Sequence, residues 1–295
     1  MMDGISDSLA GRIKVLKIYS LTLDEMLNKD ANLFLPKINL LKTRNIDCSL
    51  DTSQIFKYIF NGSMPEVFSN NTSRDIFYSS YVSTYIERDI KQLLNVEKTN
   101  EFYRFMQYIA VRTAQEINYS SISNEVGVDQ KTIKKRISIL EASGIIYLLQ
   151  PYYSNVTNRI IKAQKLYFMD TGLCSFLAKY PTPETLEVGA LSGAIFETFV
   201  VSEIIKNFTN FGLDPRLHLY FYRDKDQKEI DLIFEDGDTL IPIEIKKGVS
   251  PSSPNKNFGV LNKFNKNIGE GLIICMAKKL TPLNKNCWLC PLEYI

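Results

Sequence analysis

The residues best suited to chemistry lie in the segment 229–246, where carboxylates and a lysine fall at alternating positions. Two short runs of alternating polar and apolar residues flank an Asp-Gly-Asp-Thr sequence, which is typical of a β-hairpin. If residues 235 and 240 close this hairpin, the polar residues face each other in two pairs, Asp231 with Glu244 and Glu229 with Lys246. The pattern therefore predicts that carboxylates and an ammonium converge on one patch of sheet.

Such a patch suits a hard divalent cation, because Mg²⁺ or Mn²⁺ relieves the repulsion between carboxylates and keeps positions open for water and phosphate. A neighbouring lysine, here Lys246, can orient the attacking water or stabilise developing negative charge. The alternative is a surface hairpin with solvated charges and one cross-strand salt bridge. The hairpin alone leaves both interpretations open. Its alternation also predicts that Ile230, Leu232 and Phe234 share one face.

A third carboxylate comes from the segment 192–208, whose apolar spacing predicts a helix. Glu197 shares a face of this helix with the apolar residues Val200, Val201 and Ile204. A carboxylate on an inward-facing stripe needs a partner. A metal shared with the hairpin carboxylates would be one, and a nearby Lys or Arg would be the other.

The order of predicted elements and the motif residues give a resemblance. A strand at 217–223, a helix at about 257–267 and a strand at 271–276 accompany the helix and hairpin. With Glu197, Asp231 and the Glu244-x-Lys246 motif, this order resembles the PD-(D/E)XK nuclease-like superfamily. The runs Phe196-Glu197, Tyr222-Arg-Asp-Lys-Asp226, Glu229-Ile-Asp231 and Ile243-Glu-Ile-Lys246 look more closely like the C-terminal domain of a large family of prokaryotic AAA+-type ATPases. That domain has no known function.

The resemblance implies roles for the motif residues. Glu197, Asp231 and Glu244 would bind Mg²⁺ or Mn²⁺, and Lys246 would assist the attack of water on a phosphodiester. Glu229 is a candidate for a further ligand. The competing interpretation is a non-catalytic module that binds nucleic acid or a protein, in which the same carboxylates are structural.

The composition of the chain narrows the class of protein and its partners. The 295 residues suffice for two or three domains, and 45% hydrophobic with 23% charged residues describes an ordinary globular protein. The net charge of +2 means that any affinity for nucleic acid must come from a local patch. No apolar run approaches the roughly 20 residues that span a membrane, so we expect no membrane partner. Five scattered cysteines fit the cytoplasm. Cys287 and Cys290 lack a second pair, and His218 is the only histidine, so an apolar strand is favoured over a zinc site.

Residues 1–75 resemble the end of an ATPase core in the same AAA+ family. The run Ser8-Leu-Ala-Gly-Arg12 precedes a predicted strand at 13–19, a helix start follows at 20–25 with a Ser or Thr cap, and Asn61–Pro65 resembles a degraded Gly-Gly-x-Pro segment. No G-x-x-x-x-G-K-[ST] loop occurs anywhere in the chain. We therefore expect ATP to act only in an intact full-length relative. The chain itself is expected to be either a fragment or a gene product that lost its ATPase core. Arg12 is either an arginine finger in such a relative or the partner of a local carboxylate.

Residues 76–180 contain a second module that is recognisable in the sequence. A helical region begins at 81–91, a short helix is predicted at 122–126, and Asp129 caps a longer helix at 131–142. Strands are predicted at 145–153 and 160–169, with Asn155 and Asn158 in the turn between them. A helix-turn-helix with a two-stranded wing is the winged-helix pattern, which the family carries at this position.

The longer helix has two faces. Ile133, Ile137 and Leu140 are predicted to be buried, and Lys131, Lys134 and Lys135 cluster on the opposite side. Exposed lysines can position such a helix on DNA through phosphates. The alternative is a solvated face on a winged helix used for protein contacts or self-association, and both stay open. Asp170 or Thr171 is predicted to cap the next helix, and 181–189 to be a linker.

The sequence thus predicts an α/β multidomain protein. It comprises a C-terminal remnant of an AAA+ ATPase core with its lid helices at 1–75, a helical linker with a winged helix at 76–180, and a PD-(D/E)XK-like αβββαβ domain at 181–295.

Overall fold

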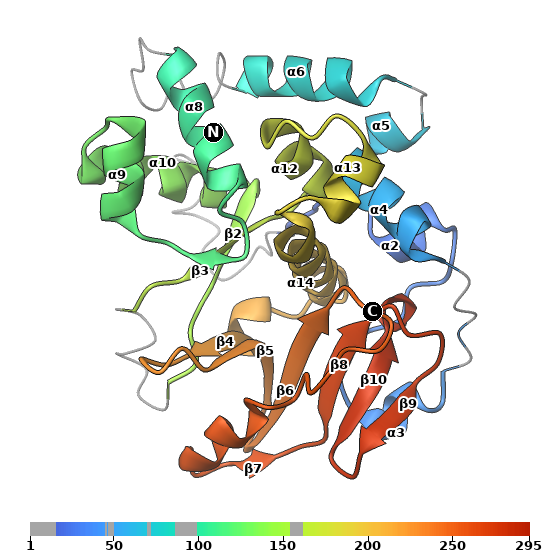
Figure 1. The fold of residues 1–295 in the computed structure, drawn as a ribbon. Coiled ribbons are helices and arrows are strands. Elements are labelled where there is room, and N and C mark those ends of the chain that lie inside the picture. The colour runs from blue at the N-terminus through green and yellow to red at the C-terminus, as the bar shows by residue number, and fades with distance from the viewer. Residues whose placement is uncertain (1–15, 45, 47–49, 70–71, 86–98, 154–161) are drawn as a thin grey trace, which may run out of the picture.

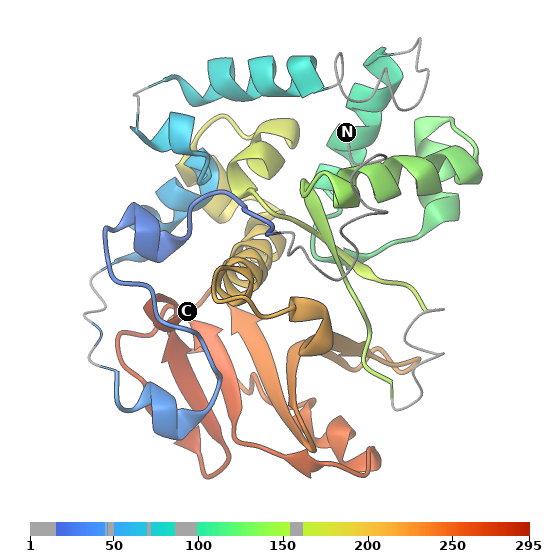
Figure 2. The same cartoon turned by 180° about the vertical axis from the view of Figure 1, so that it is seen from behind.

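The computed structural model describes residues 16–44, 46, 50–69, 72–85, 99–153 and 162–295. It is a mixed α/β structure built around one long helix, α14 (Ser192–Asn210). Figures 1 and 2 show α14 between a layer of helices on one side and a large sheet on the other. A single hydrophobic cluster extends from Leu23 to Tyr294, and most of α14 is buried within it. The helix therefore positions both layers.

The N-terminal part of the chain forms short helices. In chain order they are α2 (Leu23–Met26), α3 (Ile38–Leu41), α4 (Thr52–Asn61), α5 (Pro65–Ser69) and α6 (Arg74–Tyr85). Helix α3 lies beside the large sheet, apart from the others (Figure 1). The helices α12 (Thr171–Leu177) and α13 (Pro183–Val188) pack against α4. The predicted helix start at 20–25 is confirmed, because Thr22 caps α2 and forms a reciprocal capping box with Glu25. The segment before it is not a strand where the structure describes it, at 16–20.

A helix-and-sheet unit follows. It consists of α8 (Thr99–Ala110), β1 (Gln115–Glu116), α9 (Tyr119–Val126), α10 (Gln130–Ala142), β2 (Ile146–Leu149) and β3 (Lys165–Phe168). Its three strands are antiparallel in the order β1-β3-β2. The strands are shorter than the predicted 145–153 and 160–169. Asn155, Asn158 and Arg12 lie outside the described residues.

The large sheet has the order β4-β5-β6-β8-β10-β9. The bounds are β4 (Leu219–Arg223), β5 (Glu229–Asp236), β6 (Thr239–Lys246), β8 (Gly271–Cys275), β9 (Thr281–Asn284) and β10 (Cys287–Pro291), with β7 (Asn267–Ile268) beside β6. Strands β4 to β6 are antiparallel, whereas β6, β8 and β10 run parallel. The predicted helix at 257–267 is instead a 3₁₀ helix, η3 (Phe258–Lys263), and a second one, η2 (Pro215–Leu217), precedes β4. The strand predicted at Cys287–Cys290 is confirmed as β10.

The hairpin has the predicted register, since Glu235 pairs with Leu240. Its predicted faces are wrong at the start of β5, beyond an irregularity in the strand. The pairing of β4 with β5 shifts between Tyr220 and Tyr222, which leaves an extra residue on β5. Consequently Ile230 packs in a second cluster on the far face of the sheet, whereas Leu232 packs in the cluster that contains α14.

Among the described residues, none of the helices combines the length and apolar character needed to cross a membrane.

Candidate active site

Asp231 is held between the two strands of the hairpin. Backbone pairing of β5 with β6 ends at Leu232 and Ile243, and beyond that point the Asp231 carboxylate accepts the backbone N–H of Ile245 at 2.7 Å. The irregularity in β5 is what aims this side chain at its neighbour strand. Asp231 is almost fully buried, so its position and orientation are fixed.

Glu244 and Lys246 meet Asp231 at this end of the hairpin. The Lys246 Nζ atom lies 2.6 Å from Glu244 Oε1 and 3.7 Å from Asp231 Oδ2, so the two carboxylates flank one ammonium. The other oxygen of Glu244, Oε2, is buried and has no hydrogen-bond partner. Burial and the charge of Asp231 raise the pKa of Glu244 to about 7, and Lys246 opposes the rise. The predicted convergence of Asp231, Glu244 and Lys246 is therefore present.

Glu197 projects from α14 toward the same region but has other partners. The Lys165 Nζ atom lies 3.1 Å from Glu197 Oε1, and the Tyr167 hydroxyl donates to the same oxygen at 2.7 Å. Burial raises the pKa of Glu197 to about 7, Lys165 opposes the rise and Asp231 adds to it. Of the two partners predicted for this carboxylate, the structure provides the lysine.

Glu229 does not face Lys246, and this part of the hairpin prediction is wrong. Its carboxylate contacts Lys165 and lies 3.7 Å from Arg223, its partner on β4. The reason is the irregularity in β5, beyond which Glu229 follows β4 rather than β6. Arg223 also lies 3.6 Å from Glu116 in the helix-and-sheet unit.

Lys165 and Tyr167 are the site residues that the sequence analysis missed. Both lie on β3, and the side chain of Lys165 is only 1% exposed. Burial lowers the pKa of this lysine, but the charges around it, Glu197 first, raise it well above its usual value. A signal did exist, because alternation along β3 places Lys165 and Tyr167 on one face.

The donor set bears on which metal could bind. No three His, Cys, Asp or Glu side chains in the described part of the chain are arranged to hold a metal ion together. Mg²⁺ is commonly bound by only one or two carboxylates, with water completing its shell. Asp231 and the unpaired oxygen of Glu244 fit that requirement, whereas Glu197 is engaged by Lys165.

The basic helix α10 has the two predicted faces. Lys131, Lys134 and Lys135 are exposed, and Asp129 caps the helix by accepting the N–H of Thr132 at 3.0 Å. The apolar stripe of Ile133, Ile137 and Leu140 is buried as predicted.

Arg136 on the same helix is also buried, which the sequence analysis did not anticipate. It pairs with Glu101 and lies over the rings of Phe102 and Phe105, at 5.5 and 5.7 Å from their centroids.

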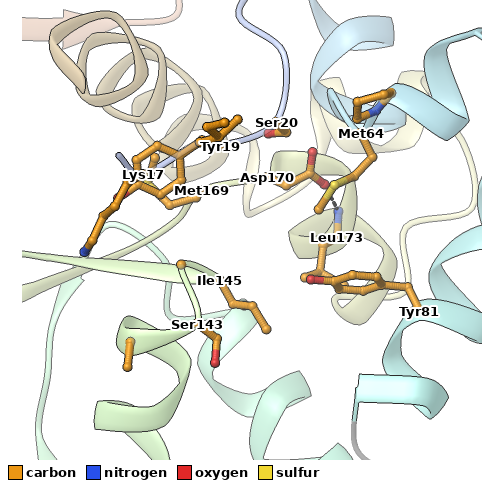
Figure 3. A pocket seen from close by; sticks show the side chains of 14 residues that line it. Lys17, Tyr19, Ser20, Met64, Tyr81, Ser143, Ile145, Met169, Asp170 and Leu173 are labelled. Carbon is orange, nitrogen blue, oxygen red and sulfur yellow. Dashed lines mark hydrogen bonds between the residues drawn. The ribbon is translucent and has the colours of Figure 1, made fainter. Parts of the chain in front are cut away.

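A separate cavity of about 340 Å³ lies where residues 17–20 meet α6, α10 and α12 (Figure 3). Asp170 forms part of its wall. Both oxygens of this carboxylate are occupied: Oδ1 accepts from the Tyr78 hydroxyl and the N–H of Leu173, and Oδ2 accepts from the N–H of Ser63. The predicted capping role of Asp170 on α12 is confirmed, and no chemistry is left for it.

In comparison with known protein families, two separate parts of the chain each match a family. Residues 52–184 match one domain of unknown function (DUF8612), and residues 192–295 match another (DUF4143). An uncharacterized protein of Mycobacterium tuberculosis and one of Mycobacterium bovis are each 24% identical to the chain over 249 residues. These alignments cover 84% of this chain and 50% of each relative, so the chain spans about half the length of those relatives.

Proposed function

We propose that residues 192–295 form a metal-dependent, nuclease-like domain in which Asp231 and Glu244 bind Mg²⁺ or Mn²⁺ and Lys246 assists hydrolysis of a phosphodiester. The observation that carries this proposal is the buried, unpaired oxygen of Glu244 beside a second carboxylate and a lysine. A buried carboxylate oxygen without a partner is costly, and a cation would satisfy it.

The positions of Asp231 and Lys246 indicate a different role for each. Asp231 is fixed by the N–H of Ile245, which leaves it one oxygen for a ligand. When bound, a divalent ion would polarise a phosphoryl oxygen and supply an activated water. The side chain of Lys246 is 41% exposed, so it can leave Glu244 and reach a phosphate. In that position its ammonium would stabilise the charge that develops on the phosphoryl group.

The arrangement of elements supports the finer assignment. Helix α14, the hairpin of β5 and β6 with β4 beside it, and the parallel strand β8 follow the order expected of a PD-(D/E)XK-like domain. The order α8, β1, α9, α10, β2, β3 supports a winged helix, with the exposed lysines of α10 as contacts for DNA. We propose DNA as the substrate for these two reasons.

Two broader assignments rest on the motif residues and the cysteines. From the family resemblance of the N-terminal motifs, we propose that residues 1–75 are the end of an AAA+ core and that ATP acts only in an intact full-length relative. Cys174, Cys275 and Cys287 are free and buried, which supports a cytoplasmic location.

A non-catalytic binding module is the second candidate, and one observation favours it. The ammonium of Lys165 already neutralises Glu197 and Glu229, so these carboxylates have a structural partner without metal. The two candidates differ in whether Asp231 and Glu244 bind an ion.

The test is calorimetry with MnCl₂ together with cleavage of supercoiled DNA, on the wild-type chain and on Asp231→Ala. We expect the wild-type chain to bind one ion and to nick DNA in the presence of Mn²⁺. Asp231→Ala should lose cleavage by at least about 100-fold and weaken Mn²⁺ binding by at least about tenfold, because one of two ligands is gone. Intact DNA with normal Mn²⁺ binding would leave a metal-binding module, and absence of both would leave only the non-catalytic candidate.

A further inference from the structure

The buried ammonium of Lys165 contacts two carboxylates near the proposed metal site, Glu197 and Glu229. We propose that its ammonium is an internal counter-cation that holds Glu197 out of the metal's coordination, so that the site takes one ion on two carboxylates. This inference rests on the proposed metal function of Asp231 and Glu244.

The contacts of Glu197 place a positive charge against its carboxylate. Lys165 and Tyr167 both bind its Oε1 atom, at 3.1 and 2.7 Å. Lys165 also contacts Glu229, so its ammonium sits between two carboxylates as a small cation would. Because the side chain of Lys165 is 1% exposed, it cannot exchange these partners for water.

The three carboxylates nevertheless lie within one electrostatic environment. The charge of Asp231 acts on both Glu197 and Glu244, and the charge of Glu197 acts on Glu244. An ion bound by Asp231 and Glu244 would therefore attract Glu197 if the ammonium were absent. In the described part of the chain, no three acidic side chains are arranged to hold one ion together.

The position of Lys165 also joins the two parts of the molecule. Its strand, β3, pairs with β1 and β2 in the sheet of the unit that bears the basic helix α10. The carboxylates lie on α14, β5 and β6. Displacement of β3 would thus carry the ammonium away from Glu197 and raise the affinity for metal.

The experiment is a double-mutant cycle with Mn²⁺ calorimetry on wild type, Lys165→Met, Glu197→Gln and the double variant. Lys165→Met should bind Mn²⁺ at least about tenfold more tightly, because Glu197 becomes a third charged ligand. Glu197→Gln removes a nearby charge but no ligand, so its affinity should stay within about tenfold of that of wild type. The double variant should lose the gain, and Lys165→Arg, which keeps the charge, should match wild type.

Three results would overturn the inference: folded Lys165→Met with unchanged or weaker affinity, a gain that survives in the double variant, or a tenfold loss in Glu197→Gln. The last result needs no change at Lys165, so it decides the matter even if Lys165→Met does not fold. Binding by Lys165→Met but not by wild type would support the counter-cation and refute the proposed wild-type metal function. Absence of binding in all four would refute both.

Discussion

At the scale of single residues, the two glutamates of the site titrate in an unusual range. Burial and the charge of Asp231 raise the pKa of Glu244 from 4.5 to about 7. The folded protein therefore holds this proton more tightly than the unfolded chain does. Its stability should fall as the pH rises from about 4.5 to about 7, since the folded state must then carry a poorly solvated charge.

Replacing Glu244 by Gln removes this titration. We expect Glu244→Gln to gain about 1–3 kcal/mol relative to wild type between pH 5 and pH 8, because each unit of pKa shift corresponds to about 1.4 kcal/mol. Glu197 titrates in the same range, so the pH dependence should shrink rather than vanish. Urea unfolding at both pH values measures the effect, and an equal difference between the two proteins at pH 5 and pH 8 would contradict it.

Sequence patterns predicted contacts within the hairpin better than contacts between elements that are distant in the chain. Alternation sufficed for Asp231 and Glu244 because the hairpin register depends on a short local turn. The partners of Glu197 come from β3, about thirty residues earlier, and no local pattern specifies that contact. Glu203 and Lys206 show the same limit: this buried pair on α14 binds the N–H of Leu23 and the carbonyl of Leu21.

At the scale of elements, the irregularity in β5 determines which side chains meet at the site, and the sequence pattern did not predict it. A strict period of two predicts that Ile230 and Leu232 share a face and that Glu229 faces Lys246. One extra residue on β5 moves Ile230 to the other face and Glu229 toward Lys165. Such a residue depends on how β5 packs between β4 and α14, which the hairpin sequence alone does not contain.

The end of α4 gives a prediction with an internal control. Gly62 and Gly127 both have a φ of 77°. A Cβ atom on Gly62 would contact the Tyr78 hydroxyl and lie 2.7 Å from Asp170 Oδ1, whereas one on Gly127 would meet nothing within 4 Å. Alanine at Gly127, where ψ is 32°, costs about 1 kcal/mol of backbone strain. The strain is larger at Gly62, because its ψ of −172° lies in a region that is essentially restricted to glycine. At Gly62 it would also break the hydrogen bonds that join α4, α6 and α12.

We therefore expect Gly62→Ala to lower the free energy of unfolding by about 2 kcal/mol or more beyond the effect of Gly127→Ala. Chemical denaturation of both variants provides the comparison. Equal losses would contradict this prediction and would show that the contacts around Asp170 tolerate displacement.

At the scale of the whole molecule, the predicted domains share one core. The described part of residues 1–75 lies against the C-terminal part: the side chain of Asn207 on α14 accepts the N–H of Phe34, and Arg44 donates to the carbonyl of Tyr294. Composition and motifs cannot reveal such contacts, because they join residues more than 150 positions apart. The helix-and-sheet unit is likewise joined to the carboxylates through Lys165.

This arrangement predicts that the basic helix and the carboxylate site act on the same DNA. The variant Lys134→Glu with Lys135→Glu should bind DNA at least about tenfold more weakly at low salt, with a smaller salt dependence, because phosphate contacts are lost. Mn²⁺ binding should be unchanged, and cleavage at low DNA concentration should fall in parallel with DNA binding. Gel shifts over a salt series and calorimetry measure these effects.

The control changes the same charge elsewhere. Lys279 and Lys285 are exposed around β9, which lies at the opposite end of the molecule from α10 (Figure 1). Lys279→Glu with Lys285→Glu alters the net charge equally and should leave DNA affinity nearly unchanged. Equal losses in the two variants would mean that α10 attracts DNA only through overall charge. Unchanged affinity in the α10 variant would assign that helix to protein contacts, and the carboxylate site would then need another route for its substrate.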